Sequence, residues 1–219
     1  MKFAAIVVIA CVAFVAWTGS PVSWAGDGHN ISSVNGNVKA DAGQTYGNLS
    51  TVNGNVRVGR GAIADEAKTV NGEIVVEDEA KVGELETVNG SVEIHDGATV
   101  ARTASTVNGS VEISNRAHVG GSVSTVSGEI ELKGAEVGGK LTTHNGNIEL
   151  TDGARVRGGI HIKKKNDNSW SFGRDEPLQV SICGTCVVDG ELRFDRPVEL
   201  RVAQGGKIGQ VIGDSVTRR

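Results

Sequence analysis

The sequence predicts an all-β fold, a single-stranded parallel β-solenoid (β-helix) built from short coils. Three observations support this prediction. A Val-Asn-Gly phrase recurs at a nearly constant interval, small aliphatic residues occur in pairs two positions apart, and the 31 glycines recur at long intervals rather than at every third position. Aromatic residues make up only 4% of the 219 residues. A conventional globular core would therefore lack large side chains, so the core must be narrow and repetitive.

The repeat has seven copies separated by steps of 18 or 19 residues. The copies begin at Val34, Val52, Val70, Val88, Val107, Val126 and His144. A period this regular is typical of stacked supersecondary units. One copy cannot bury its own apolar positions, so each coil must stack on the coil before it and pair with it. Coils of about 18 residues suit a right-angled or three-sided tube, and we expect it to be right-handed.

Alternation within a copy indicates strands rather than helices. Val111 with Ile113 and Ile130 with Leu132 are pairs whose members face one side of a strand. Glycine between such pairs turns the chain through a corner. In one copy we expect the inward residues to be Val107, Val111, Ile113, Ala117, Val119 and Val123.

The polar residues of the motif then form exposed columns. If the motif valine points inward, its neighbours point outward, and identical side chains in successive coils lie one above another. The expected threonine column is Thr51, Thr69, Thr87, Thr106 and Thr125, and the expected asparagine column is Asn53, Asn71, Asn89 and Asn108. Asparagine before glycine is also typical of turns. We favour a structural ladder over a flat binding face of the ice-binding kind.

The first 25 residues have the pattern of a signal peptide. Lys2 supplies the positive charge, Phe3 to Trp17 is an apolar run, and Ser23-Trp24-Ala25 is a small-x-small cleavage site. The run is shorter than the ~20 residues of a membrane-spanning helix, so we expect cleavage near Ala25 and no transmembrane segment in the mature chain. A lipoprotein signal ending at Cys11 is the alternative, but it would leave a hydrophobic stub.

The rest of the chain, residues 26–219, is predicted to be one solenoid. Regular coils are expected over about 32–162, a loop over 163–177, and degenerate coils over 178–216. The mature formal charge is 21 − 26 = −5, because cleavage removes one lysine from 22 basic residues and leaves 26 acidic ones. A mildly acidic chain is a poor general binder of nucleic acid.

Cleavage would also leave only two cysteines, Cys183 and Cys186. We expect them to form a disulfide in an oxidising compartment. The same spacing also fits a redox motif or half of a zinc site. The flanking residues indicate strands rather than a helix N-terminus that would activate a thiolate, and no second cysteine pair completes a zinc site.

A column of carboxylates is predicted on one face. Glu93, Glu112, Glu131 and Glu149 occupy one position in four successive coils. Stacked carboxylates repel one another, so the column must be solvated, partly protonated or neutralised by cations. We favour a solvated acidic face over a calcium site, and no cofactor or metal is expected.

The loop 163–177 is the candidate site for binding a partner. It contains Lys163, Lys164, Lys165, Trp170 and Phe172, a basic patch beside two large aromatic groups. Such a combination is favoured in the centre of interfaces. The alternative is that both aromatics cover an exposed flank of the solenoid.

The recurrent Thr-Val-Asn-Gly-x-Val-x-Ile phrase resembles the repeats of bacterial adhesin-type β-solenoid proteins of the cell envelope. The resemblance extends from Ser33 to about Leu150, and more distantly the coils are similar in style to bactofilins, which polymerise end to end. It implies a non-enzymatic structural or interaction protein in the periplasm or at the cell surface, with an envelope protein or polysaccharide as partner. Bactofilins typically lack a signal peptide, so this chain departs from them.

Two other functions remain open. A solenoid with uncapped ends could assemble end to end as a scaffold. A polysaccharide-active β-helix enzyme is the less favoured alternative, because the repeat does not bring a Ser, His and acid set or clustered catalytic acids together, and we assign no catalytic residues.

Overall fold

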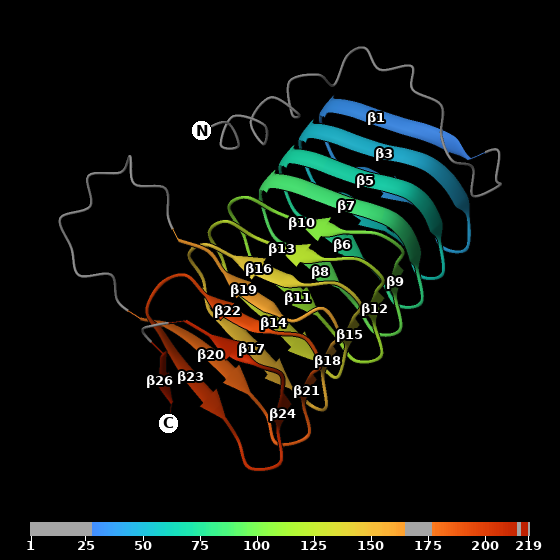
Figure 1. The fold of residues 1–219 in the computed structure, drawn as a ribbon. Helices are drawn as coiled ribbons and strands as arrows, with labels where there is room; N and C mark the ends of the chain where they lie inside the picture. The colour runs from blue at the N-terminus through green and yellow to red at the C-terminus, as the bar shows by residue number, and fades with distance from the viewer. Residues whose placement is uncertain (1–27, 165–176, 214–215, 219) are drawn as a thin grey trace, which may run out of the picture.

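The computed structural model describes residues 28–164, 177–213 and 216–218. It confirms the fold class: these residues form a parallel β-solenoid whose strands belong to two sheets, and none of them is helical (Figure 1). Every strand pair is parallel, and each strand is paired with strands of the neighbouring coils.

The first sheet, sheet B, takes one strand from each of ten coils. Val, Ile and Leu at its inward positions are favoured in strands buried on one face. Equivalent residues pair in register: Val111 lies opposite Val92 on one side and Ile130 on the other. In spatial order the strands are β2 (Val38–Ala40), β4 (Val56–Val58), β6 (Ile74–Val76), β8 (Val92–Ile94), β11 (Val111–Ile113), β14 (Ile130–Lys133), β17 (Ile148–Thr151), β20 (Leu178–Ile182), β23 (Val198–Val202) and β26 (Val216–Arg218).

The second sheet, sheet A, changes form along the solenoid. Its first strands are long and bent: β1 (His29–Asn35), β3 (Thr45–Asn53), β5 (Ile63–Asn71) and β7 (Lys81–Asn89). Beyond β7 each coil contributes two short strands in place of one long strand. One arm contains β9 (Thr99–Val100), β12 (His118–Val119), β15 (Glu136–Val137), β18 (Arg155–Val156), β21 (Val187–Val188) and β24 (Lys207–Ile208). The other contains β10 (Ala104–Ser105), β13 (Val123–Ser124), β16 (Leu141–Thr143), β19 (Ile160–Ile162), β22 (Leu192–Phe194) and β25 (Val211–Ile212).

One extra residue at the corner accounts for the split. In β7 the inward residues Val82 and Leu85 are three positions apart, whereas in the next coil Val100 and Ala104 are four apart. The two inward residues keep their partners, because Val100 pairs with Val82 and Ala104 with Leu85. The additional residue therefore forms a corner, and the coils from β9 onward have three faces.

The core consists of columns of small aliphatic side chains along the axis. Within the expected inward set, Val111, Ile113, Ala117, Val119 and Val123 are at most 1% exposed, as predicted. At one corner the column is narrow, and it contains Ala62, Ala80, Ala98, Ala117, Ala135, Ala154 and Cys186. Close stacking leaves little room in this column, and six of these seven side chains are methyl groups.

The predicted orientation of the motif valine and threonine is wrong. The threonines face the core: Thr51, Thr69, Thr87, Thr106 and Thr125 are 1–4% exposed. The valines face outward, because strand alternation places them opposite the threonines. Val34 is 65% and Val126 is 37% exposed, and the four between them, Val107 included, are partly exposed. The asparagines are exposed, as predicted.

Candidate functional site

Each residue of the Thr-Val-Asn-Gly motif has a separate role at the corner between sheets A and B. The threonine hydroxyl donates a hydrogen bond to the glycine carbonyl of the preceding coil. For Thr87 and Gly72 the distance is 3.0 Å, and the same bond occurs at Thr51, Thr69, Thr106 and Thr125 with distances of 2.8–2.9 Å. The buried hydroxyl and the corner carbonyl therefore satisfy each other.

The asparagines form a continuous amide ladder. Each Nδ2 donates to Oδ1 of the asparagine one coil earlier at 2.9 Å, in the series Asn35, Asn53, Asn71, Asn89 and Asn108. The expected hydrogen-bonded ladder is therefore present. Each internal amide still has one N–H and one oxygen lone pair that this ladder does not use.

The residue after glycine supplies a second ladder. The side-chain oxygen at this position accepts the backbone N–H of its counterpart in the next coil. Asn37 accepts from Asn55 at 2.8 Å, and Ser110 accepts from Glu129 at 3.2 Å. The corner therefore keeps its backbone paired although the strands end there.

The valines and asparagines together make an exposed strip along the solenoid, which we call the Val–Asn strip. It contains Val34, Val52, Val70, Val88, Val107 and Val126 with Asn35, Asn53, Asn71, Asn89 and Asn108. None of these side chains carries a charge, although 22% of the chain is charged. The strip repeats the same apolar and amide groups once per coil.

The threonine bonds give a matched pair of variants. We expect Thr87→Val to lower the free energy of unfolding by about 1–2 kcal/mol, because the Gly72 carbonyl loses its hydroxyl donor. Thr143 occupies the same column and is fully buried, and among the described residues its hydroxyl has no hydrogen-bond partner. Thr143→Val should therefore be neutral or stabilising. Denaturant unfolding measures both values, and equal losses would contradict the assigned role of the hydroxyl.

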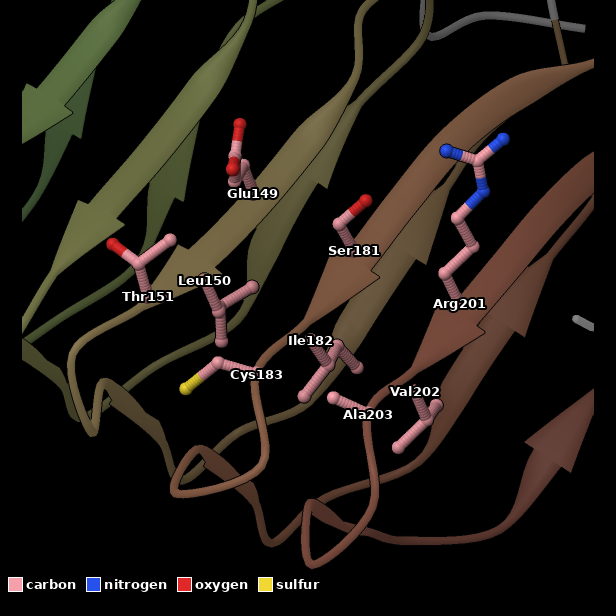
Figure 2. A pocket seen from close by; sticks show the side chains of 9 residues that line it. All are labelled: Glu149, Leu150, Thr151, Ser181, Ile182, Cys183, Arg201, Val202 and Ala203. Carbon is pink, nitrogen blue, oxygen red and sulfur yellow. The ribbon is translucent and has the colours of Figure 1, made fainter.

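A hollow of about 340 Å³ lies at the end of sheet B, where β17, β20 and β23 are neighbours (Figure 2). Glu149, Ser181 and Arg201 pair in register and project in the same direction. Cys183 and Ala203, in the turns after β20 and β23, also line it. Residues more than 50 positions apart in sequence meet here, which the repeat period alone did not reveal.

The cysteines form a disulfide in the structure, with Cα atoms 5.1 Å apart. Cys186 is fully buried in the alanine column, whereas Cys183 is partly exposed. The Thr185 hydroxyl lies 3.3 Å from the Cys183 sulfur. The pair links the first and last residues of a turn, where the Cys186 N–H donates to the Cys183 carbonyl at 3.1 Å.

The predicted glutamate column is present. Glu93, Glu112, Glu131 and Glu149 pair in register across β8, β11, β14 and β17. The Lys133 ammonium lies 2.8 Å from Glu112 and 3.1 Å from Glu131, and their hydrogen bonds raise its pKa. Burial raises the pKa of Glu73, and its hydrogen bond with Glu93 adds to the shift. Across the described ranges no three His, Cys, Asp or Glu residues form a metal-ligand group.

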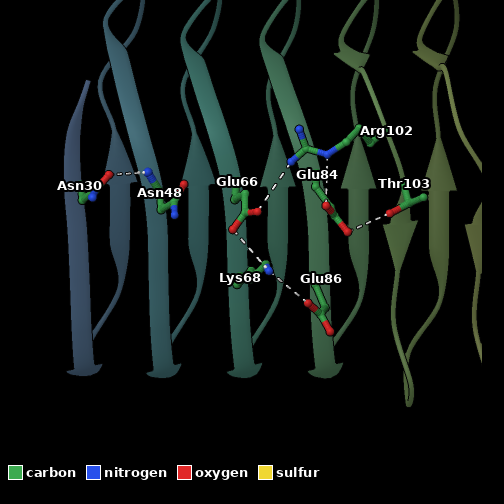
Figure 3. A network of polar contacts seen from close by, with 8 residues as sticks. All are labelled: Asn30, Asn48, Glu66, Lys68, Glu84, Glu86, Arg102 and Thr103. Carbon is green, nitrogen blue, oxygen red and sulfur yellow. Dashed lines mark hydrogen bonds and ion pairs between the residues drawn. The ribbon is translucent and has the colours of Figure 1, made fainter. Parts of the chain in front are cut away.

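A second polar network joins the long strands of sheet A (Figure 3). Lys68 bridges Glu66 and Glu86 at 3.3 and 3.4 Å, and Arg102 bridges Glu66 and Glu84 at 3.6 and 3.2 Å. Burial alone lowers the pKa of Lys68, but the surrounding carboxylates outweigh it and the net shift is upward. Every member contacts an oppositely charged group of its own or a neighbouring coil, which indicates a structural cross-link rather than a binding site.

The predicted loop site is only partly described. Lys165, Trp170 and Phe172 lie outside the described residues. Lys164 is exposed, and the backbone of Lys163 is anchored to the carbonyl of Thr143 at 2.9 Å. The solenoid resumes at β20, which pairs with β17 in the usual register.

No protein-family model matches the chain, and comparisons with curated proteins and with solved structures find no significant match. No helix within the described part of the chain is long and apolar enough to cross a membrane. The repeat architecture is therefore established by the structure itself, while any role must be argued from the surface.

Proposed function

We propose that this protein is an exported, non-enzymatic interaction protein of the bacterial cell envelope that binds a repeating polysaccharide along the Val–Asn strip. The observation that supports the proposal is the outward motif valine. Inward valines are explained by the core, but six outward valines beside an amide ladder are not needed to close the coils.

The chemistry of the strip favours a neutral ligand with both polar and apolar groups. Sugar rings present hydroxyls that can pair with the unused amide N–H and oxygen of each asparagine, and C–H groups that can contact valine methyls. A charged ligand would find no countercharge among the valines and asparagines of the strip.

The period of the strip favours a ligand that is itself periodic. Adjacent coils present the same groups at one strand spacing, about 4.8 Å. A long chain can occupy several identical weak sites at once, so its affinity rises with length without any new kind of contact. A compact protein partner gains much less from such repetition.

Export and envelope location rest on the sequence. Residues 1–25 have the signal-peptide pattern, and the Thr-Val-Asn-Gly phrase resembles envelope adhesin repeats. The loop 163–177 remains a possible additional contact, with its aromatic residues outside the described part.

The test compares two valine substitutions on different faces. Val70→Lys places a charge on the strip, and Val75→Lys places one outward on sheet B, in the column that already contains Lys39 and Arg57. Binding is measured to N-acetylglucosamine oligomers of increasing length, which are neutral and periodic. We expect affinity to increase with length, Val70→Lys to lower it by about tenfold, and Val75→Lys to leave it unchanged.

Several outcomes would count against this proposal. Equal effects of the two variants would exclude the strip, and the absence of length dependence would exclude a periodic ligand. Capture of an envelope protein with no sugar binding would favour a protein partner instead.

End-to-end assembly is a second candidate, and the ends of the sheets support it. Among the described strands, β1 and β2 at one end and β24, β25 and β26 at the other each pair on one side only. Unpaired parallel edges of matching coil shape can template another copy. Filaments seen by electron microscopy of the purified protein would support this role.

A further inference from the structure

The Cys183–Cys186 disulfide closes a turn that other coils form without it. The N–H of Ala80 donates to the Glu77 carbonyl at 3.1 Å and that of Ala154 to the Thr151 carbonyl at 3.0 Å, in the same phase as Cys186 to Cys183. Six preceding coils have alanine where Cys186 stands. Cross-linking so short a loop also removes little entropy from the unfolded chain. The fold therefore gains little from this bond.

The two sulfurs differ in accessibility. The Cys186 side chain is 0% exposed within the alanine column. Cys183 is partly exposed and lines the 340 Å³ hollow together with Ser181 and Ala203 (Figure 2). Exchange needs an attacking thiolate to approach one sulfur along the line of the bond. Of the two cysteines, Cys183 is the one exposed enough for such an approach.

The surroundings of Cys183 can also stabilise its reduced form. The Thr185 hydroxyl, 3.3 Å from the sulfur, can donate a hydrogen bond to a thiolate. Arg201 lines the hollow too, but its guanidinium is held by Glu199 through Nε at 2.9 Å and Nη2 at 2.7 Å. Its charge is therefore largely compensated, and Thr185 is the group that assists Cys183.

We propose that Cys183–Cys186 is a thiol–disulfide exchange site at which external thiols attack Cys183, and that the solenoid keeps its fold in both redox states. The attacking thiolate forms a bond to the Cys183 sulfur, and the Cys183–Cys186 bond breaks. Cys186 leaves with the electron pair and takes a proton from water, since its apolar site disfavours a charged sulfur. A second thiol then attacks the mixed disulfide and releases Cys183. In total, two external thiols are oxidised to one disulfide, and the Cys183–Cys186 disulfide is reduced to two thiols.

The first test follows reduction of the folded protein by glutathione, in a Cys11→Ser background that removes the third cysteine. The bond should be reduced under native conditions, and circular dichroism and the unfolding midpoint should change little. Maleimide labelling after reduction should modify Cys183 at least about tenfold faster than Cys186, which reacts only when the coil opens. A bond that is reduced only after denaturation, or whose reduction unfolds the coils, would show a structural cross-link and overturn the proposal.

The second test uses single-cysteine variants that the repeat itself supplies. Cys186→Ala introduces the residue found in the six preceding coils, and Cys183→Ala introduces the residue at the equivalent Ala203. With oxidised glutathione, Cys186→Ala should form a mixed disulfide at Cys183, whereas Cys183→Ala should remain unmodified while folded. Equal modification of both variants would contradict the proposal that external thiols attack Cys183 rather than Cys186. Reaction with a small thiol but not with a dithiol protein such as thioredoxin would restrict the site to low-molecular-weight thiols.

Discussion

Substituting alanine for Gly90 should destabilise the solenoid strongly, because the glycine of each motif lies against the backbone of the preceding coil. A Cβ at Gly90 would overlap the carbonyl oxygen and carbon of Gly72 in the preceding coil. Both glycines lie in corners between strands, and the Asn ladder before them and the pairing of β8 with β6 after them hold the coils together. The coils must separate to admit the methyl group, and we expect a loss of about 4 kcal/mol or more, which is exceptional for one substitution.

Gly43→Ala is the matched control. Gly43 has a φ of +68°, but no atom of the described part of the chain lies within 4 Å of the Cβ position. Gly43→Ala tests the effect of the positive φ without steric overlap of the added methyl group. We expect it to lower the free energy of unfolding by about 1 kcal/mol. Chemical denaturation measures both losses, and the yield of protease-resistant protein is a second measurement if Gly90→Ala does not fold. Similar losses for the two variants would show that coil spacing at the corner is adjustable.

The repeat made the architecture predictable from the sequence. Because equivalent residues in successive copies must pair, the period alone placed Val92, Val111 and Ile130 in one column and Glu93, Glu112 and Glu131 in the neighbouring outward one, and the register agrees. The Asn ladder followed for the same reason. A period predicts which residues stack, whatever the direction in which their side chains point.

Direction was predicted wrongly where hydrophobicity and alternation disagreed. Hydrophobicity favours valine for the core, yet Val126 follows the inward Val123 by three positions and Thr125 follows it by two. Alternation therefore already required threonine inward. The buried threonine is tolerated because its hydroxyl reaches the Gly109 carbonyl of the preceding coil, a partner that is not apparent until the coils are stacked.

The candidate sites were predictable to different extents. Cys183 and Cys186 were recognisable from their spacing, but the asymmetry between them depends on which wall of the tube each faces. The hollow forms where β17, β20 and β23 are neighbours, and the segment 163–177 lies between β17 and β20 in the sequence. The repeat period does not fix the length of that segment, so it does not predict which residues meet in the hollow. Sites on solenoids therefore arise where equivalent positions hold unequal side chains, such as Ser181 between Glu149 and Arg201.

Leu85→Ala should cause the second large loss of stability. Leu85 is fully buried and lies between Ala67 and Ala104 in one column, and Leu49 precedes Ala67 there. From Leu49 to Ala104 large and small side chains alternate, so Leu85 fills the space that its two alanine neighbours leave. Three consecutive alanines would leave a cavity across three coils, and we expect the free energy of unfolding to fall by about 3–5 kcal/mol.

Val123→Ala is the comparison in the same column, between Ala104 and Leu141. A smaller side chain is removed there, so the expected loss is about 2 kcal/mol. Adding Ala104→Leu to Leu85→Ala moves the large side chain one coil along and should restore part of the stability, as measured by denaturant unfolding. In a solenoid each coil contacts only its neighbours, so the cavity cannot be filled from elsewhere in the molecule. A loss below about 1 kcal/mol for Leu85→Ala would mean that adjacent coils collapse into the space, and the columns would then be adaptable rather than rigid.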